Sequence, residues 1–242
     1  GTAHSLTVND SSNTTLGGAV GGSGNPLSSV TTNAGGSTAI NGGSVTTTGT
    51  QHYGDDVTLG NPTTITTGTT ASFDGQITGG ANSLTISGNA VLGDGAGSDT
   101  VTAGSLSVSG TTNIKTDTIT TAGTQTYSGA VTVTSTTGTS TLSTTNSAVL
   151  FGSTTTLAGN LTVNAGSGNI TFTGAVDGGK DLIANSTGLT QFSAAVGSGN
   201  PLSSVTTNAG GSTAINGGSV TTTGAQHYGD DVTLGNPTTI TT

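Results

Sequence analysis

One sequence feature limits the possible folds of this chain most strongly: a long stretch of it occurs twice. Residues 22–67 reappear 175 positions later as residues 197–242, with a single difference among 46 residues, Thr50 against Ala225. A fold that must accept the same unit more than once is nearly always an array of stacked repeats. We therefore expect residues 1–242 to form one continuous repetitive segment of a longer periodic chain.

The duplication also sets the expected boundaries. Residues 22–196 are predicted to form one full long repeat, and residues 197–242 to begin the next one. Residues 1–21 match residues 182–196 more loosely, because the apolar positions align while the identities differ. They are predicted to be the diverged end of a preceding long repeat.

The composition favours strands and argues against helices. There are 43 Gly, and charged residues make up only 5%. Short segments alternate apolar residues with Thr, Ser or Asn, such as SLTIS at residues 83–87 and NLTVN at residues 160–164. This alternation is typical of strands with one apolar face. Good helix formers are scarce and Gly falls every few residues, so the chain is predicted to be all-β.

A shorter period runs inside the long repeat. Its marker is an aromatic or large aliphatic residue followed by small residues and then Val or Ile, and it occurs at Tyr53, Phe73, Leu92, Tyr127, Leu150, Phe172, Phe192 and Tyr228. Successive gaps are 20, 19, 35, 23, 22, 20 and 36 residues. If the two large gaps are double steps, the 175-residue repeat divides into nine steps of about 19 residues.

Strands this short are not stable alone, but stacked turns of similar sequence bury their apolar edges on one another. We therefore predict a parallel β-helix (β-solenoid) with one coil per step and nine coils per long repeat. All four prolines, at positions 26, 62, 201 and 237, stand in Gly-Asn-Pro and are expected at corners between strands. An array of immunoglobulin-like sandwiches is the alternative, but seven aromatic residues and a period this short fit it poorly.

The charges exclude several functions. Eleven Asp stand against Lys115 and Lys180, giving a net charge of −9, so nothing could neutralise the phosphates of a nucleic acid. There is no Cys to form a disulfide framework, and no apolar stretch is long enough to span a membrane. Only three His occur, and none accompanies a Gly-x-Ser-x-Gly motif. The chain is predicted not to be an enzyme, with no catalytic residues and no cofactor-binding residues.

One segment suggests a metal. DGAGSDTV at residues 94–101 is similar to the calcium-binding nonapeptide of β-roll proteins, which makes Asp94 and Asp99 candidate calcium ligands. Calcium needs six to eight oxygen ligands, which successive turns supply in those rolls, and only one copy is present here. The alternative is a Gly-rich corner without a metal.

Two other patterns have a functional and a structural interpretation. His52 stands near Asp55 and Asp56, which could support metal binding or acid–base chemistry. Adjacent residues of a strand point to opposite sides, so we expect Tyr53 to pack and the two carboxylates to lie at a solvated turn.

Runs of Thr, as at residues 63–67, suit an exposed strand face and could also order water, as in ice-binding solenoids.

The coil length and sequences such as GNLTVN at residues 159–164 and GNITFTGAV at residues 168–176 resemble filamentous-haemagglutinin-like exoproteins and repetitive autotransporter adhesins of Gram-negative bacteria. The resemblance implies a right-handed parallel β-helix, secretion to the cell surface, and a role in adhesion or surface structure.

These observations together predict a non-enzymatic stalk or filament on the bacterial cell surface. Its expected partners are further copies of itself, joined head-to-tail or laterally. The alternative is an adhesin module whose exposed coil faces recognise a glycan or a host protein. A Thr-rich ice-binding solenoid is the third hypothesis.

Overall fold

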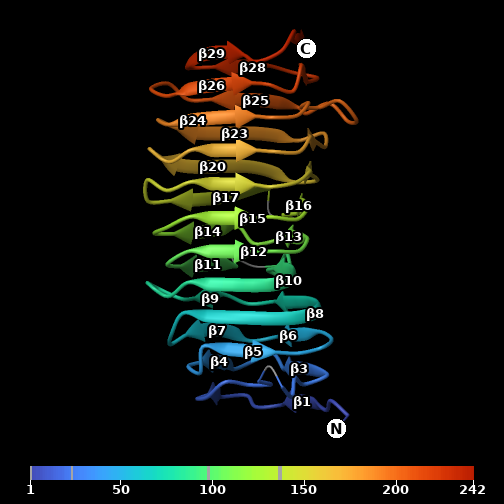
Figure 1. The fold of residues 1–242 in the computed structure, drawn as a ribbon, viewed down its shortest axis with the longest axis vertical. Coiled ribbons are helices and arrows are strands. Elements are labelled where there is room, and N and C mark those ends of the chain that lie inside the picture. Colours follow the sequence, from blue (N-terminus) through green and yellow to red (C-terminus); the bar gives the residue numbers. More distant parts are fainter. Residues whose placement is uncertain (1, 23, 97–98, 136–137) are drawn as a thin grey trace.

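The computed structural model describes residues 2–22, 24–96, 99–135 and 138–242. All regular structure in these residues is β, and the paired strands run parallel to their neighbours. Figure 1 shows the strands stacked turn upon turn, from the N-terminus at one end to the C-terminus at the other. The chain makes about 11 turns with a spacing of about 21 residues. The prediction of an all-β parallel β-solenoid is confirmed.

Each turn has three faces, which the chain visits in a fixed order. Face 1 begins with β1 at the N-terminal end, and Val196 continues it between β22 and β27 by bridges to Val176 and Val220. Its strands are β1 (Ser5–Val8), β3 (Ser29–Thr32), β6 (Gln51–Tyr53), the second half of β8 (Thr63–Phe73), the second half of β10 (Leu84–Leu92), β13 (Thr112–Ile114), β16 (Val131–Val133), β19 (Thr155–Leu157), β22 (Val176–Asp177), β27 (Ser219–Thr221) and β30 (Thr239–Thr241).

Face 2 is a separate sheet, in which every strand pairs with the strand one turn before and one turn after it. Its strands are β2 (Asn13–Leu16), β4 (Ser37–Ile40), β7 (Asp56–Leu59), β9 (Ile77–Thr78), β11 (Thr100–Ala103), β14 (Thr118–Thr121), β17 (Thr139–Thr144), β20 (Asn160–Gly166), β23 (Asp181–Ser186), β25 (Ser204–Thr207) and β28 (Gln226–Tyr228).

Face 3 is joined to face 1 where β8 and β10 continue around the corner between them. It starts at the bridge between Val20 and Val45. Its strands are β5 (Ser44–Thr46), the first halves of β8 and β10, β12 (Leu106–Val108), β15 (Gln125–Tyr127), β18 (Val149–Phe151), β21 (Ile170–Phe172), β24 (Leu189–Phe192), β26 (Ser212–Ile215) and β29 (Asp231–Leu234).

Apolar side chains point inward from all three faces and form one narrow core along the axis. Strand alternation places Val, Leu and Ile inside, together with some Thr such as Thr112 and Thr155, and leaves mostly Thr or Ser outside. Aromatic rings stack between successive turns, with ring centroids 4.7 Å apart for Phe151 and Phe172 and 5.4 Å apart for Phe172 and Phe192. The four prolines lie outside the strands, between faces, as predicted.

The predicted count of nine 19-residue coils per long repeat is wrong, because the marker residues change face along the chain. Leu92 is on face 1 and Tyr127 on face 3, so the 35-residue gap between them covers five faces rather than the six of a double step. The 36-residue gap from Phe192 on face 3 to Tyr228 on face 2 also covers five. In addition, Leu150 faces outward, and the buried residues of its strand are Val149 and Phe151.

The corrected count gives the long repeat a non-integral number of turns. From Val30 on face 1, eight turns lead to Val196 on the same face, and Val205, the copy of Val30, lies one face further on. The 175 residues therefore pass over 25 faces of seven residues each on average.

Candidate functional site

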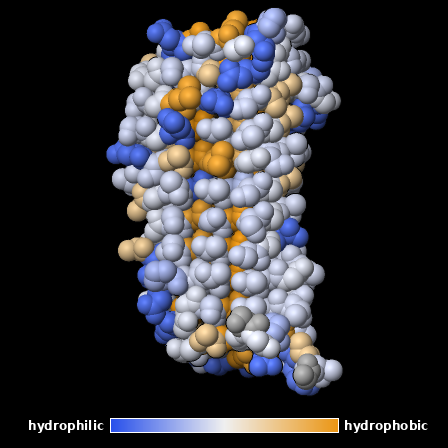
Figure 2. Space-filling view, viewed as in Figure 1, coloured by the Kyte–Doolittle hydropathy of each residue, from blue (hydrophilic) through white to orange (hydrophobic). Residues whose placement is uncertain are grey.

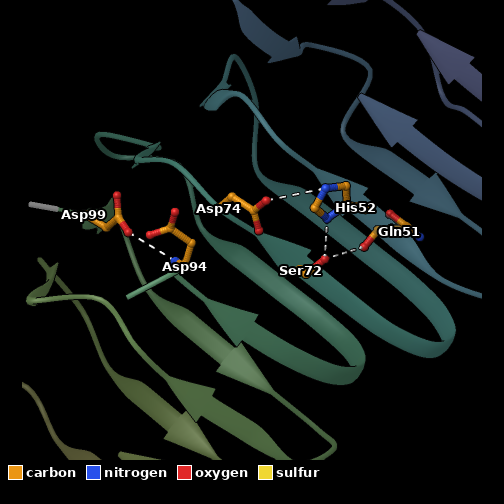
Figure 3. A network of polar contacts seen from close by, with 6 residues as sticks. All are labelled: Gln51, His52, Ser72, Asp74, Asp94 and Asp99. Atoms are coloured by element: carbon orange, nitrogen blue, oxygen red, sulfur yellow. Dashed lines mark hydrogen bonds and ion pairs between the residues drawn. The ribbon is translucent and has the colours of Figure 1, made fainter. Parts of the chain in front are cut away.

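Three polar side chains meet on the outside of face 1 (Figure 3). His52 lies in β6, and Ser72 is its register partner in β8, one turn later. The Nδ1 atom of His52 lies 2.9 Å from the Ser72 hydroxyl, and its Nε2 atom lies 3.4 Å from a carboxylate oxygen of Asp74. The spacing of the turns, rather than a local motif, brings these three residues together.

Their surroundings favour a structural link over a reaction. The side chains of His52 and Asp74 are 43% and 38% exposed, so no wall shields them from water. Ser–His–Asp catalysis also needs donors aimed at a developing oxyanion. The nearby backbone N–H of Asp74 instead donates to the carbonyl of Tyr53 in the strand ladder, at 2.9 Å. An exposed pair of this kind contributes at most about 1 kcal/mol. This group of residues therefore supports a polar link between adjacent turns.

The predicted grouping of His52 with Asp55 and Asp56 does not form. His52 points outward, and Tyr53 is buried in the core with its ring stacked on Phe73, as the packing interpretation expected. Asp56 is exposed, and its carboxylate accepts a hydrogen bond from the backbone of Gln76.

Asp55 is buried, so its predicted position at a solvated turn is wrong. Only 3% of its surface is exposed. Its carboxylate accepts hydrogen bonds from the backbone N–H of Gly36 at 3.0 Å and from the hydroxyl of Thr38 at 3.2 Å, both in the preceding turn. A buried carboxylate needs such partners, and here they hold a corner of one turn against the next.

The candidate calcium ligands lie in the loop between β10 and β11. Figure 3 shows them beside His52, Ser72 and Asp74. Asp94 accepts a hydrogen bond from the N–H of Ala96 at 2.6 Å, and Asp99 accepts one from the N–H of Asp94 at 3.2 Å. Burial raises the pKa of Asp99, and the neighbouring carboxylates of Asp94 and Asp117 raise it further.

These contacts give both carboxylates partners within their own loop. Residues 97 and 98 of the motif lie outside the described residues. Among the residues that the structure describes, no group of three or more His, Cys, Asp or Glu could hold a metal ion. Calcium ligation by Asp94 and Asp99 stays a prediction.

Sequence reasoning missed a buried glutamine that recurs at the corners. The amide of Gln125 donates to the carbonyls of Ile119 and Ser143 and to the hydroxyl of Thr121, and its oxygen accepts the Tyr127 hydroxyl at 3.0 Å. Gln51 and Gln226 make the equivalent contacts. The signal was available in the sequence as Val or Ile, Thr-Thr-x-Gly-x-Gln-x-Tyr at residues 45–53, 119–127 and 220–228.

Hydroxyl groups form two columns along part of face 3. The outward positions of five successive turns are all Ser or Thr, namely Ser44, Thr46, Thr64, Thr66, Thr85, Ser87, Ser107, Ser109, Thr126 and Ser128. Leu150 and Gly152 interrupt both columns in the next turn. The regular array that an ice-binding face would need is therefore limited to five turns.

One depression of about 440 Å³ lies near the N-terminal end, and its lining includes His4, Asn25 and Leu27. Another, of about 170 Å³, lies on face 1 over β8, β10, β13 and β16, and its lining includes Asn89 and Asn113. None of the residues that line this smaller depression is titratable. Figure 2 shows this view of the molecule to be mostly pale, with scattered hydrophilic groups in blue and hydrophobic groups in orange along the middle. Among the described residues, no helix is long and apolar enough to cross a membrane.

No protein-family model matches the chain, and searches of curated proteins and of solved structures return no significant match.

Proposed function

We propose that this chain is a non-enzymatic structural segment of a long, secreted bacterial surface protein, where it forms a stiff stalk or filament. One observation carries the proposal: the second long repeat begins without a break in the stack. β25 pairs in register with β23, and β26 with β24, so one core passes from the first repeat into the next. The length of such a rod scales with the number of repeats.

The contacts between turns support stiffness. Each turn is held to its neighbours on three faces by parallel strand pairs and, inside, by buried apolar side chains. Interiors packed in this way have low compressibility and transmit strain. Lys115 and Lys180 are the only cationic side chains, so trypsin-like proteases would find few cleavage sites.

The location at the cell surface rests on the resemblance to filamentous-haemagglutinin-like exoproteins and autotransporter adhesins. A solenoid is the architecture that this resemblance implies.

Self-association, either head-to-tail or lateral, is the proposed assembly mode. Unpaired strand edges are templates for further pairing, and lateral contact would use the hydroxyl-rich faces.

A binding module for glycans receives less support from the surface. Six of the seven aromatic residues are fully buried, and the seventh, Tyr228, is partly buried against the core. The rings on which a sugar could stack are thus occupied by packing.

Electron microscopy of this chain and of a chain carrying one further 175-residue repeat tests the proposal. Because strands stack about 4.8 Å apart, eight turns and one face should lengthen the rod by about 40 Å. Antibody labelling of intact cells of the source organism tests the surface location. Globular particles, or a length that does not change with the extra repeat, would overturn the rod.

A further inference from the structure

The two copies of the duplicated sequence lie on different faces of the solenoid. We call residues 22–67 and 197–242 the copied blocks. β3 of the first block is on face 1, whereas its copy β25 is on face 2. β4 on face 2 becomes β26 on face 3, and β5 on face 3 becomes β27 on face 1. Every strand of the second block is displaced by one face in the same direction.

Several local contacts survive this displacement, although the Thr38 hydroxyl donates to Asp55 while its copy Thr213 donates to Thr207. The Gly36 N–H lies 3.0 Å from the Asp55 carboxylate, and the copied pair, Gly211 and Asp230, is 2.9 Å apart. Gly35 has a φ of 102° and its copy Gly210 a φ of 103°, a conformation that favours Gly. The same seven-residue pieces therefore fold in the same way at different corners.

The buried glutamine shows that all three faces are interchangeable. Gln51 with Tyr53 lies on face 1, Gln226 with Tyr228 on face 2, and Gln125 with Tyr127 on face 3. In each case the tyrosine hydroxyl donates to the glutamine oxygen, at 2.8 Å, 2.8 Å and 3.0 Å. Since no face demands a sequence of its own, a repeat can end on any of them.

The displacement follows from the number of faces in one long repeat. The long repeat covers 25 faces, and each turn has three, so a repeat ends one face beyond a whole number of turns. A third of a rotation is added with each repeat, and the original orientation returns only after three repeats.

We infer that successive long repeats present the same surface on successive sides of the rod. This inference rests on the proposed function, in which long repeats follow one another. The outer surface around Thr31 and His52 recurs as Thr206 and His227, one face around the rod.

Cysteine cross-linking tests the displacement in the 242-residue chain, which has no native Cys. Ile183 and Thr206 are register partners on face 2. Neighbouring strands are about 4.8 Å apart, within the range that a disulfide spans. The variant with Ile183→Cys and Thr206→Cys should therefore form an intramolecular disulfide on mild oxidation.

The competing arrangement has its own variant. If the second block kept the face of the first, β25 would follow β22 on face 1, and Thr206 would lie beside Asp177. The variant with Asp177→Cys and Thr206→Cys should thus stay reduced. Two matched pairs on face 1, Thr7→Cys with Thr31→Cys and Thr156→Cys with Asp177→Cys, should form disulfides in either arrangement.

A link between positions 177 and 206, or no link between positions 183 and 206 when both matched pairs react, overturns the inference. Electron microscopy of the same variants distinguishes failure of this inference from failure of the proposed function. If the particles are rods but the disulfide between positions 177 and 206 forms, only the displacement of the second copied block is refuted. As a second measurement, gold particles on the variant with Thr31→Cys and Thr206→Cys should project from different sides of the rod. Projection from one side would also overturn the inference.

Discussion

The ring of Tyr53 lies 4.9 Å from the ring of Phe73, with 7° between their planes, although the two residues are 20 positions apart. The pair belongs to two successive turns of face 1 and is fully buried. Tyr228, the copy of Tyr53, lies in the second copied block near the C-terminal end and is only partly buried. Identical sequence thus occurs here in two environments, which allows matched experiments within one molecule.

The first prediction concerns this stack. Replacing Phe73 by Ala should lower the free energy of unfolding by about 3 to 5 kcal/mol, because it leaves a cavity beneath a buried ring. Denaturant unfolding followed by circular dichroism measures the effect. Phe73→Leu is the control and should cost clearly less, since it fills most of the space. Equal losses for the two variants would show that packing volume does not govern this position.

The copied leucines provide the second prediction. Leu59 is 5% exposed, whereas its copy Leu234 is 55% exposed in the last turn of the chain. Leu59→Ala should lower the free energy of unfolding by about 2 to 5 kcal/mol. Leu234→Ala should change it little, because little apolar surface is lost from the core.

The third prediction concerns the buried glutamine. Gln125→Leu should cost about 2 to 3 kcal/mol, because the Tyr127 hydroxyl and the backbone carbonyls that the amide contacts lose their partner. Adding Tyr127→Phe removes the Tyr127 hydroxyl, which is one of the groups that Gln125→Leu leaves without this partner. A double-mutant cycle should therefore show that the two substitutions together cost less than the sum of their separate effects. Additive costs would mean that the two side chains are not coupled.

Buried threonines give a stabilising prediction. The hydroxyl groups of Thr112 and Thr155 point into the core on face 1, and neither has a hydrogen-bond partner among the residues that the structure describes. Replacing either by Val keeps the shape and removes the cost of burying the hydroxyl, so each should raise the free energy of unfolding by about 1 kcal/mol. Thr132→Val, on the outside of the same face, is the matched control and should have almost no effect. If Thr112→Val lowered the free energy of unfolding instead, the Thr112 hydroxyl would have to form a hydrogen bond in the folded protein.

The sequence alone predicts the repeat, the strands and the corners, because these depend on local patterns. The duplication, the alternation of Val or Leu with Thr, and Gly-Asn-Pro all reflect short-range constraints. The number of turns could not be predicted, because the distance between register partners varies, from 18 residues for Thr100 and Thr118 to 25 for Val20 and Val45. Only pairing shows to which face a marker residue belongs.

The environments of the candidate site residues could likewise be predicted only where they depend on local sequence. Packing of Tyr53 could be predicted from its strand, whereas the contact of His52 with Ser72 and Asp74 depends on the length of the whole intervening turn. Burial of Asp55 depends on Gly36 and Thr38 in the previous turn, which no local pattern links to it.

The last prediction concerns the tyrosines at high pH. Burial raises the pKa of Tyr228 to about 12 and raises the pKa values of Tyr53 and Tyr127 further. Tyrosine in an unfolded chain titrates near pH 10. Between about pH 10 and pH 12 the unfolded chain therefore releases protons that the folded chain retains, and linkage makes the folded state less stable. The stabilising effect should be complete below pH 10 and should decline above it.

Phenolate absorbance, followed together with circular dichroism, measures this titration. In the folded protein Tyr228 should ionise first, near pH 12, and Tyr53 and Tyr127 only with unfolding. Tyr228→Phe should remove the first step and leave the later one in place, because the other two rings lie deeper in the stack. If all three tyrosines ionised together near pH 10 while the β-sheet signal stayed intact, the rings would be open to solvent, and the packed core between turns could not be correct.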